Sequence, residues 1–242
     1  GAQKKADELA VKMLYMGTAS EVDVEGQIQL VEDLIKRKVT GIAVSPTDSK
    51  ALGPVVKRAV QAGIKVITID SDTTERDRLC YIGTNNRAAG KVAGEQLLTL
   101  LAGTKGKVAT ITGVLGAQNT DERVAGFKEA VGDRVALLDV QPDNGNKDKS
   151  MAIAESMLTA NPDVAAFFTT TAIGGPATAQ ALLTAGKVGQ IKVVCFDTTP
   201  TLIKHLKAGT VQVLIAQQPE KMGALAVEKL MEAARGGTLP AV

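Results

Sequence analysis

The chain has 242 residues, of which 45% are hydrophobic, enough to bury the core of one or two globular domains. Its 28 Lys and Arg and 26 Asp and Glu give a net charge of +2 and are spread along the whole length, so neither nucleic acid nor a membrane surface is an expected partner. The longest apolar runs fall far short of the roughly 20 residues that span a bilayer. Cys80 and Cys195 each lie in an apolar run, and both are expected to be buried thiols.

Short runs rich in Val and Ile alternate with amphipathic stretches of helical period, and the chain opens on helical spacing at Ala2 to Ala10. Strands are predicted over Val11–Tyr15, Gly41–Val44, Lys65–Ile69, Leu79–Ile82, Lys107–Ile111, Val135–Val140, Val164–Phe168, Ile191–Phe196 and Val211–Ala216. Helices are predicted over Val24–Arg37, Ala51–Ala62, Arg87–Leu101, Asp121–Val131, Ser150–Ala160, Ala177–Ala185 and Glu220–Ala234. This alternation predicts parallel sheets joined by right-handed crossovers, the doubly wound α/β class.

The number of predicted strands exceeds what one small doubly wound sheet usually holds. Residues 102–106, Ala-Gly-Thr-Lys-Gly, form a small and flexible break among them. Two lobes are therefore expected.

Polar side chains follow several of the predicted strands, where ligands of open α/β sheets bind. Asp48 and Ser49 follow one strand and are expected to cap the next helix. Asp70 and Asp197 each close a long apolar strand, where an unpaired carboxylate is costly, so each is expected to meet a partner or a ligand hydroxyl. Gln217 follows the last predicted strand.

Arg123 stands out among the basic residues because it lies near a predicted helix start, after Asn119-Thr120-Asp121 and before Gly126-Phe127. Two interpretations remain open. The planar guanidinium would project into a cleft and donate to two vicinal hydroxyls or a ring oxygen of a ligand, or it would form an ordinary surface ion pair.

No pattern of catalytic groups, metal ligands or cofactor-binding glycines emerges, so we expect no enzyme, no cofactor and no metal. Gly113 and Gly116 give G-x-x-G where a dinucleotide fingerprint needs G-x-G-x-x-G. The segment Asp143–Asp148 begins like a calcium loop but has no glycine at the sixth position. With one histidine, the chain offers neither a zinc cluster nor a hydrolytic triad.

Taken in order, these segments resemble the ribose-type periplasmic sugar-binding proteins, the substrate-binding components of ABC transporters. The resemblance runs almost end to end. It rests on Ser45-Pro46-Thr47-Asp48-Ser49, Val66–Asp70, Ile82–Asn86 with Ala89-Gly90, Arg123 with Gly126-Phe127, Asn161–Val164, Phe196-Asp197 and Ile215–Pro219.

The resemblance implies a periplasmic-binding-protein type I fold, with two Rossmann-like lobes joined by a three-stranded hinge and a neutral sugar or polyol bound between them. Lobe one would be residues 1–102 plus 219–242, and lobe two residues 103–218. The protein would be a periplasmic or membrane-tethered extracellular monomer that delivers its ligand to an ABC permease. The family's first and last strands are expected to lie outside these 242 residues.

The resemblance also implies roles for individual residues. Asp70 would accept hydroxyl protons from lobe one, Arg123 and Asp197 would hold the sugar from lobe two, and Gln217 would lie by the hinge. Thr171 would supply one hydrogen bond.

Three departures from the family pattern argue against ribose itself as the ligand. Ser71 stands where an Arg is frequent, Thr171-Ala172 stand where an Asn-Asp pair is usual, and Asn144 or Gly145 replaces a ring-stacking aromatic. Two relatives of the same architecture remain as alternatives: the effector domain of a lactose-repressor-type regulator, and a sensor-coupled autoinducer-binding protein.

Overall fold

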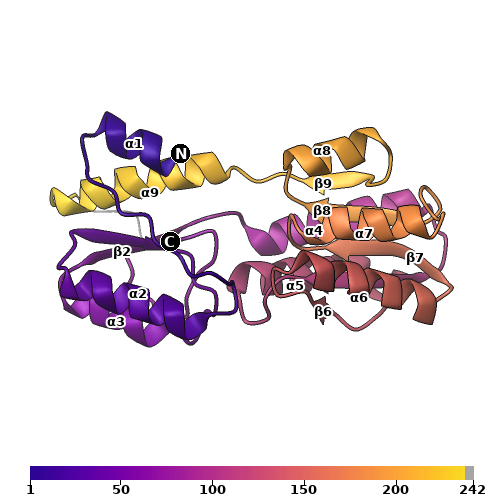
Figure 1. Ribbon diagram of the computed structural model, residues 1–242, viewed down its shortest axis with the longest axis horizontal. Coiled ribbons are helices and arrows are strands. Elements are labelled where there is room, and N and C mark those ends of the chain that lie inside the picture. Colours follow the sequence, from indigo (N-terminus) through magenta and orange to yellow (C-terminus); the bar gives the residue numbers. More distant parts are fainter. Residues whose placement is uncertain (238–242) are drawn as a thin grey trace. The chain divides into compact units, whose positions relative to one another are not determined.

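The computed structural model describes residues 1–237 and divides the chain into two compact units (Figure 1). Among the described residues, unit 1 comprises Gly1–Thr84, Gly116–Asn119 and residues 218–237, and unit 2 comprises Asn85–Leu115 and Thr120–Gln217. Residues 238–242, which the sequence assigns to lobe one, lie outside the described residues.

Unit 1 is a parallel sheet of order β1-β2-β3 with helices on both faces. Its strands are β1 (Gly41–Val44), β2 (Lys65–Ile69) and β3 (Cys80–Ile82), and its helices are α1 (Ala2–Glu8), α2 (Val24–Lys36), α3 (Gly53–Gln61) and α9 (Pro219–Ala234). Helices α1 and α9 lie on one face, and α2 and α3 lie on the other (Figure 1). Ile42, Val55 and Val66 are buried between the sheet and α2 and α3.

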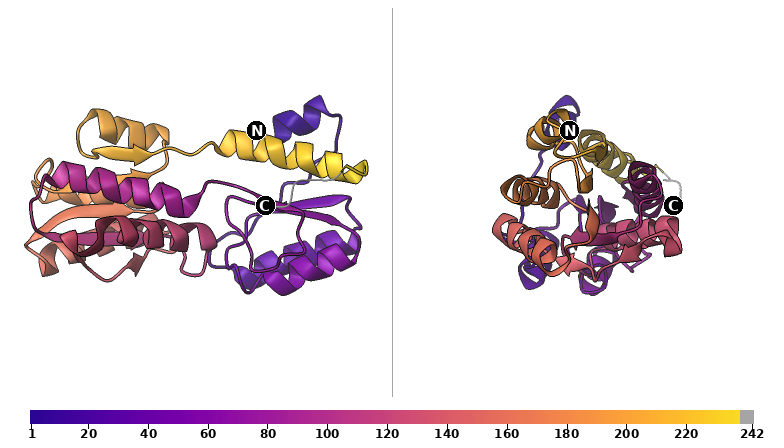
Figure 2. Two further views of the ribbon diagram at one scale, coloured as in Figure 1. Left: turned by 180° about the vertical axis from the view of Figure 1, so that it is seen from behind. Right: turned by 90° about the vertical axis from the view of Figure 1, so that its right-hand side faces the viewer.

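Unit 2 is a second parallel sheet, of order β5-β4-β7-β8-β9, with β6 also paired to β4. Its strands are β4 (Lys107–Thr112), β5 (Ala136–Leu137), β6 (Gln141–Pro142), β7 (Val164–Thr169), β8 (Lys192–Phe196) and β9 (Val213–Ile215). Its helices are α4 (Asn86–Leu101), α5 (Gln118–Val131, of which the first two residues belong to unit 1), α6 (Lys147–Ala160), α7 (Gly174–Thr184) and α8 (Pro200–Lys207). Figure 2 shows helices on both faces of this sheet.

The core of unit 2 lies on both faces of its sheet, which explains why the strands are apolar without alternation. Phe168 belongs to the cluster under α4 and α5, where its ring stacks on Phe127 at 4.1 Å. Its neighbour Phe167 belongs to the opposite cluster, under α6 and α7 with Leu182. Every strand pairing of the two sheets within residues 1–237 is parallel, and the predicted α/β class, with parallel sheets flanked by helices, is confirmed.

The predicted strand at Val11–Tyr15 is wrong. These residues have no regular structure, Tyr15 is 91% exposed, and β1 pairs with β2 alone among residues 1–237. A strand needs a hydrogen-bonded neighbour, so β-propensity without a pairing partner does not produce one.

The predicted strand at Val135–Val140 is interrupted and forms β5 and β6. Val108 of β4 pairs with Leu137, and Ile111 of β4 pairs with Gln141. Between these two pairs β4 advances by three residues, whereas the segment from Leu137 to Gln141 advances by four. The one extra residue in that segment interrupts the ladder of hydrogen bonds, as a β-bulge does.

The chain first passes from unit 1 to unit 2 between Thr84 and Asn85, whereas the resemblance implies a boundary between residues 102 and 103. The reason is that α4 packs on β7, β8 and β9 and so belongs to unit 2. The residues Ala102 and Gly103, with φ angles of 48° and 82°, end α4 within unit 2.

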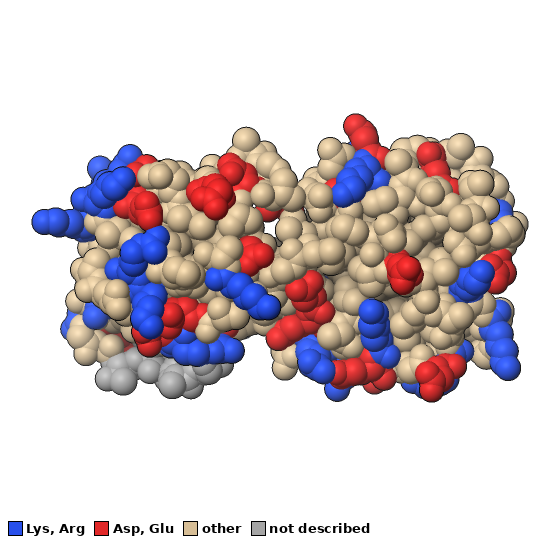
Figure 3. Space-filling model, turned by 90° about the horizontal axis from the view of Figure 1, so that it is seen from below, with Lys and Arg blue, Asp and Glu red and all other residues tan. Residues whose placement is uncertain are grey.

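Basic and acidic side chains are interspersed on the face drawn in Figure 3, in keeping with the near-neutral composition. Within residues 1–237, no helix combines the length and the apolar character needed to cross a membrane.

Candidate ligand-binding site

Two aspartates end corresponding strands in the two units with the same backbone geometry. Asp70 follows β2 and Asp197 follows β8, with φ angles of 59° and 77°. Each backbone N–H donates to the last residue of the next strand, Asp70 to Ile82 at 3.0 Å and Asp197 to Ile215 at 2.9 Å. A positive φ is uncommon outside glycine and is best tolerated by Asn and Asp. Both carboxylates are thus presented at the carboxyl end of a sheet by a turn that suits aspartate.

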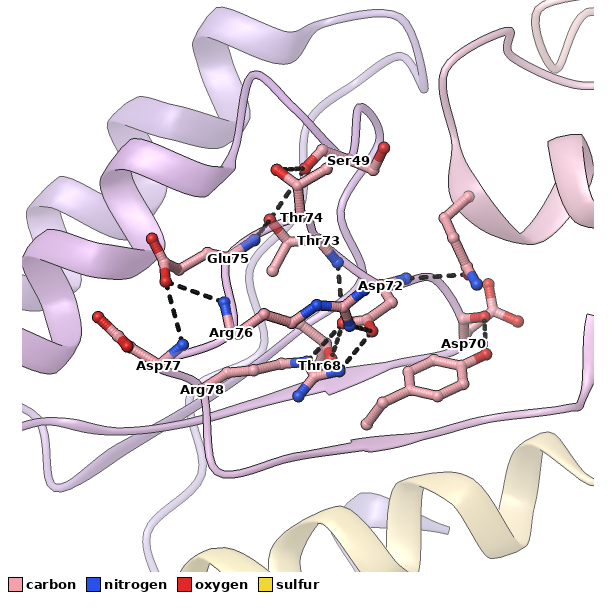
Figure 4. Close-up of polar contacts among 12 residues, drawn as sticks. Ser49, Thr68, Asp70, Asp72, Thr73, Thr74, Glu75, Arg76, Asp77 and Arg78 are labelled. Atoms are coloured by element: carbon pink, nitrogen blue, oxygen red, sulfur yellow. Dashed lines mark hydrogen bonds and ion pairs between the residues drawn. The ribbon is translucent and has the colours of Figure 1, made fainter. Parts of the chain in front are cut away.

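In unit 1, the carboxylate and carbonyl of Asp70 are both held by neighbouring side chains. Asn119 donates from Nδ2 to Oδ2 of Asp70 at 2.8 Å. The hydroxyl of Tyr81 donates to the carbonyl oxygen of Asp70 at 2.8 Å (Figure 4). These contacts fulfil the expectation that a carboxylate closing an apolar strand has a hydrogen-bonding partner.

In unit 2, the amide of Gln217 links an aspartate to an arginine. Its Nε2 donates to Oδ1 of Asp197 at 2.7 Å, and its Oε1 accepts from Nη2 of Arg123 at 2.9 Å. The amide oxygen thus faces the cation and the amide N–H faces the anion, which fixes the orientation of all three side chains. The structure brings together three of the residues that the sequence singled out.

Arg123 is buried, with 2% of its surface exposed, so the interpretation as a surface ion pair is wrong. Its Nε donates to Oδ1 of Asn86 at 2.9 Å, and its Nη1 donates to the carbonyl of Thr170 at 2.8 Å. The guanidinium carbon lies 4.3 Å from the ring centroid of Phe196, a cation–π distance. A buried cation is tolerated only when acceptors replace its hydration, and these contacts hold Arg123 in one position.

Close helix packing places Arg123 in that position. A Cβ atom at Gly90 of α4 would overlap the carbonyl of Arg123 on α5, and a Cβ atom at Gly126 of α5 would overlap the carbonyl of Arg87 on α4. The two glycines therefore let α4 and α5 approach until their backbones touch. Any larger side chain there would move Arg123 relative to the end of the sheet.

The remaining predicted residues also follow strands. Thr171 is half-buried after β7, and its carbonyl accepts from Sγ of Cys195 at 3.5 Å. Ser71 is 2% exposed, and its Oγ has no hydrogen-bond partner in the structure. Asn144 and Gly145 follow β6 with φ angles of 58° and 71°.

The expectation that Asp48 and Ser49 cap the next helix is wrong, because the N-cap of α3 is Leu52 and no side chain caps this helix. Oδ1 of Asp48 instead accepts the backbone N–H groups of Lys50 and Ala51, at 2.9 and 2.7 Å, within the turn that precedes α3. Its carboxylate therefore stabilises a local turn, unlike those of Asp70 and Asp197.

Sequence reasoning does not identify two asparagines that hold site residues, Asn86 and Asn119. Asn86 is fully buried, and its Oδ1 accepts from Nε of Arg123, 37 residues away in the chain. Asn119 donates to Asp70, 49 residues away. No local sequence pattern identifies partners at such separations.

Both cysteines are buried, as predicted, and burial raises the pKa of the Cys195 thiol to about 12. Among the described residues, no three His, Cys, Asp or Glu side chains gather as a metal site would require.

Residues 1–238 match the family of the periplasmic binding protein domain, and the chain belongs to this family. It is similar to the ribose import binding protein of Escherichia coli, with 35% identity over 237 residues that cover 98% of this chain and 79% of that protein. It is also similar to the D-ribose/D-allose-binding protein of Pseudomonas aeruginosa, with 31% identity over 234 residues that cover 94% and 73%.

Solved structures of carbohydrate transport proteins superpose closely on the chain. A carbohydrate transporter solute binding protein from Agrobacterium radiobacter, in complex with D-arabinose, has a TM-score of 0.95 and 28% identity, covering 99% of this chain and 83% of that one. An ABC transporter solute binding protein from Burkholderia graminis, also in complex with D-arabinose, has a TM-score of 0.94 and 37% identity, covering 98% and 84%.

Proposed function

We propose that this chain is the solute-binding component of an ABC transporter and binds a neutral sugar or polyol. The observation that carries this proposal is the linked arrangement of Asp197, Gln217 and Arg123, which holds a carboxylate and a guanidinium in fixed positions at the end of a parallel sheet. Carboxylates accept from sugar hydroxyls, and a guanidinium donates to hydroxyl or ring oxygens.

The residues that bind the ligand are Asp70 in unit 1 and Arg123, Thr171, Asp197 and Gln217 in unit 2. Because both aspartates have their carboxyl groups fixed by amide side chains, their orientation is set before a ligand arrives. Such preorganisation reduces the entropy lost on binding. Hydrogen bonds from hydroxyls to a carboxylate contribute about 1.5–3 kcal/mol each.

The charge of these groups favours a neutral ligand. Each unit presents a carboxylate at a strand end, and only the one in unit 2 is linked to a guanidinium, so these groups favour a neutral ligand over a sugar acid or a sugar phosphate. The four phenylalanines of the chain are fully buried in the cores of unit 2, where Phe196 packs against the guanidinium of Arg123, so none of them offers a ring face to a ligand. The site residues named above would recognise the ligand through hydrogen bonds to its hydroxyls.

Delivery to a membrane permease, a monomeric state and a periplasmic or tethered extracellular location complete the proposal. The relatives support transport over gene regulation, because they are named as import binding proteins or as solute binding proteins of transporters. We propose no catalytic role for any residue.

Thermal unfolding, followed by circular dichroism, against neutral pentoses, hexoses and polyols tests this proposal. A ligand at a hundred times its Kd adds about 2.7 kcal/mol to the free energy of unfolding. At about 2–4 °C per kcal/mol for a chain of this size, Tm should rise by roughly 5–11 °C. Sugar phosphates and uronic acids are the matched controls and should give no rise. A chain stripped of copurified ligand that responds to no neutral sugar, or only to the acidic ones, contradicts the proposal.

A further inference from the structure

We propose that Asn119 is a positioning residue for ligand binding, which holds the carboxylate of Asp70 in the orientation that accepts sugar hydroxyls. This inference rests on the proposed function. Its structural basis is the 2.8 Å hydrogen bond from Nδ2 of Asn119 to Oδ2 of Asp70, made across 49 residues of sequence. Because one carboxylate oxygen is bound to the amide, the plane of the carboxylate and the direction of its second oxygen are fixed.

Unit 2 contains the same device at its own aspartate. Asp197 has the same positive φ, the same backbone bond to the next strand and an amide donor, Gln217, at 2.7 Å from one oxygen. The two amides come from unrelated places in the sequence: Asn119 is the second residue of α5, and Gln217 follows β9. Two separate segments thus give each strand-ending aspartate the same neutral donor, which identifies Asn119 as the counterpart of Gln217.

Asn119 is itself anchored by the short segment that carries it, Gly116–Asn119. The carbonyl of Gly116 accepts the backbone N–H of Ser49 at 3.0 Å, and Oε1 of Gln118 accepts the backbone N–H of Asp72 at 3.3 Å. These bonds fix the segment against the loops that follow β1 and β2. Asn119 therefore reaches Asp70 from a fixed backbone, which a positioning residue requires.

The loop that begins at Asp70 is anchored from its other side by a buried ion pair (Figure 4). Arg78 donates from Nε to Oδ1 of Asp72 at 2.6 Å, and Oγ1 of Thr68 donates to the same oxygen at 2.6 Å. The guanidinium of Arg78 thus binds the carboxylate of Asp72, which stabilises the loop, whereas the amide of Asn119 orients the carboxylate of Asp70. Asp72 therefore has a structural role, and Asp70 has the binding role.

Isothermal titration of the full chain with the neutral sugar that raises Tm most tests this assignment. The variant Asn119→Ala should bind that sugar about tenfold or more weakly, because the charged acceptor loses its fixed orientation. Lys128→Ala is the control: it truncates an exposed side chain of the same helix, α5, and leaves both the bond to Asp70 and the contacts that anchor Asn119 intact, so its Kd should change by less than about threefold.

A reversal of the pair separates positioning from a purely structural role. In the double variant Asp70→Asn with Asn119→Asp, an amide at position 70 can donate to a carboxylate at position 119, so the hydrogen bond survives with its polarity reversed. We expect Tm to recover toward the wild-type value while sugar affinity stays low, because the carboxylate no longer stands at the strand end.

The possible outcomes are distinct. Unchanged affinity in Asn119→Ala, or wild-type affinity in the reversed pair, overturns the assignment of Asn119 and leaves the proposed function standing. A wild-type chain that binds no neutral sugar overturns the proposed function and this inference with it. Loss of affinity in Asn119→Ala with retention in Lys128→Ala supports both.

Discussion

Replacing Arg78 by methionine should strongly destabilise the protein, because it leaves a buried carboxylate without its charged partner. Arg78 donates from Nε and Nη2 to the two oxygens of Asp72, at 2.6 and 2.5 Å. The two side chains are 4% and 9% exposed. Methionine keeps much of the apolar stem of Arg78 but provides no donor, so the substitution removes the charge and the hydrogen bonds with little loss of packing.

The size of the effect follows from the burial of the pair. Removing one partner of a buried ion pair costs about 3–5 kcal/mol, because the other charge remains buried and unpaired. At about 2–4 °C per kcal/mol for a chain of this length, Tm should fall by roughly 6–20 °C. Urea unfolding of wild type and variant, followed by circular dichroism, measures the difference directly.

Arg76 provides a control on the same acceptor. Its Nη1 lies 3.5 Å from Oδ2 of Asp72, but its side chain is 74% exposed. An exposed ion pair contributes about 0–1 kcal/mol, so Arg76→Met should leave the unfolding midpoint almost unchanged. If Arg78→Met costs no more than Arg76→Met, the account of Asp72 as a buried anchor is refuted.

Acid should diminish the effect of Arg78→Met. Burial opposes ionisation of Asp72, but the hydrogen bonds from Arg78, Thr68 and Thr73 outweigh it and hold the pKa of Asp72 below its ordinary value of 3.8. Because the unfolded chain takes up this proton at a higher pH than the folded chain, the stabilisation is complete above the ordinary pKa and is lost as pH falls through the lower, folded one. The stability difference between wild type and variant should therefore be largest near neutral pH and should shrink below about pH 4.

Three further outcomes follow from other buried groups. Burial raises the pKa of Asp143, whose Oδ2 has no hydrogen-bond partner, so ionisation of this buried group lowers the stability of the folded protein as pH rises. Asp143→Asn should therefore stabilise the protein at pH 7 and should have no such effect near pH 3, and equal changes in the free energy of unfolding at the two pH values would contradict this. Gly126→Ala should force α5 from α4 and weaken sugar binding by displacing Arg123, as titration calorimetry would show; an unchanged Kd would disprove the role of the close packing. Cys80 and Cys195 should react with a thiol reagent at pH 8 only after unfolding, and rapid labelling of both in the native state would contradict their burial.

Much of the fold could be predicted because its signals are local. Runs such as Lys65–Ile69 and Val164–Phe168 are mostly apolar without a regular alternation of polar residues, which is the pattern of parallel strands covered on both faces, and they form β2 and most of β7. The predictions failed where structure depends on a neighbour. Val11–Tyr15 has strand composition but no strand to pair with, and Val135–Val140 is split by the register of β4.

The candidate site divides in the same way. Asp70 and Asp197 could be found from sequence because a carboxylate at the end of an apolar strand is costly without a partner. Their partners could not be found, because the contacts Asn119 to Asp70 and Asn86 to Arg123 join residues far apart in the chain. Local pattern thus identifies groups that need partners, and only the tertiary structure supplies the partners.

The most direct test of the central claim, that the ordered polar groups at the strand ends bind a neutral sugar, is titration calorimetry of wild type and Asp197→Asn with the same sugar. The substitution removes one charge but keeps an oxygen that can accept from Gln217, at a position whose positive φ asparagine also tolerates. The account predicts sugar binding by the wild type and about a 10- to 100-fold weaker Kd in the variant, the equivalent of one charged hydrogen bond. Equal affinity in the two proteins would contradict it.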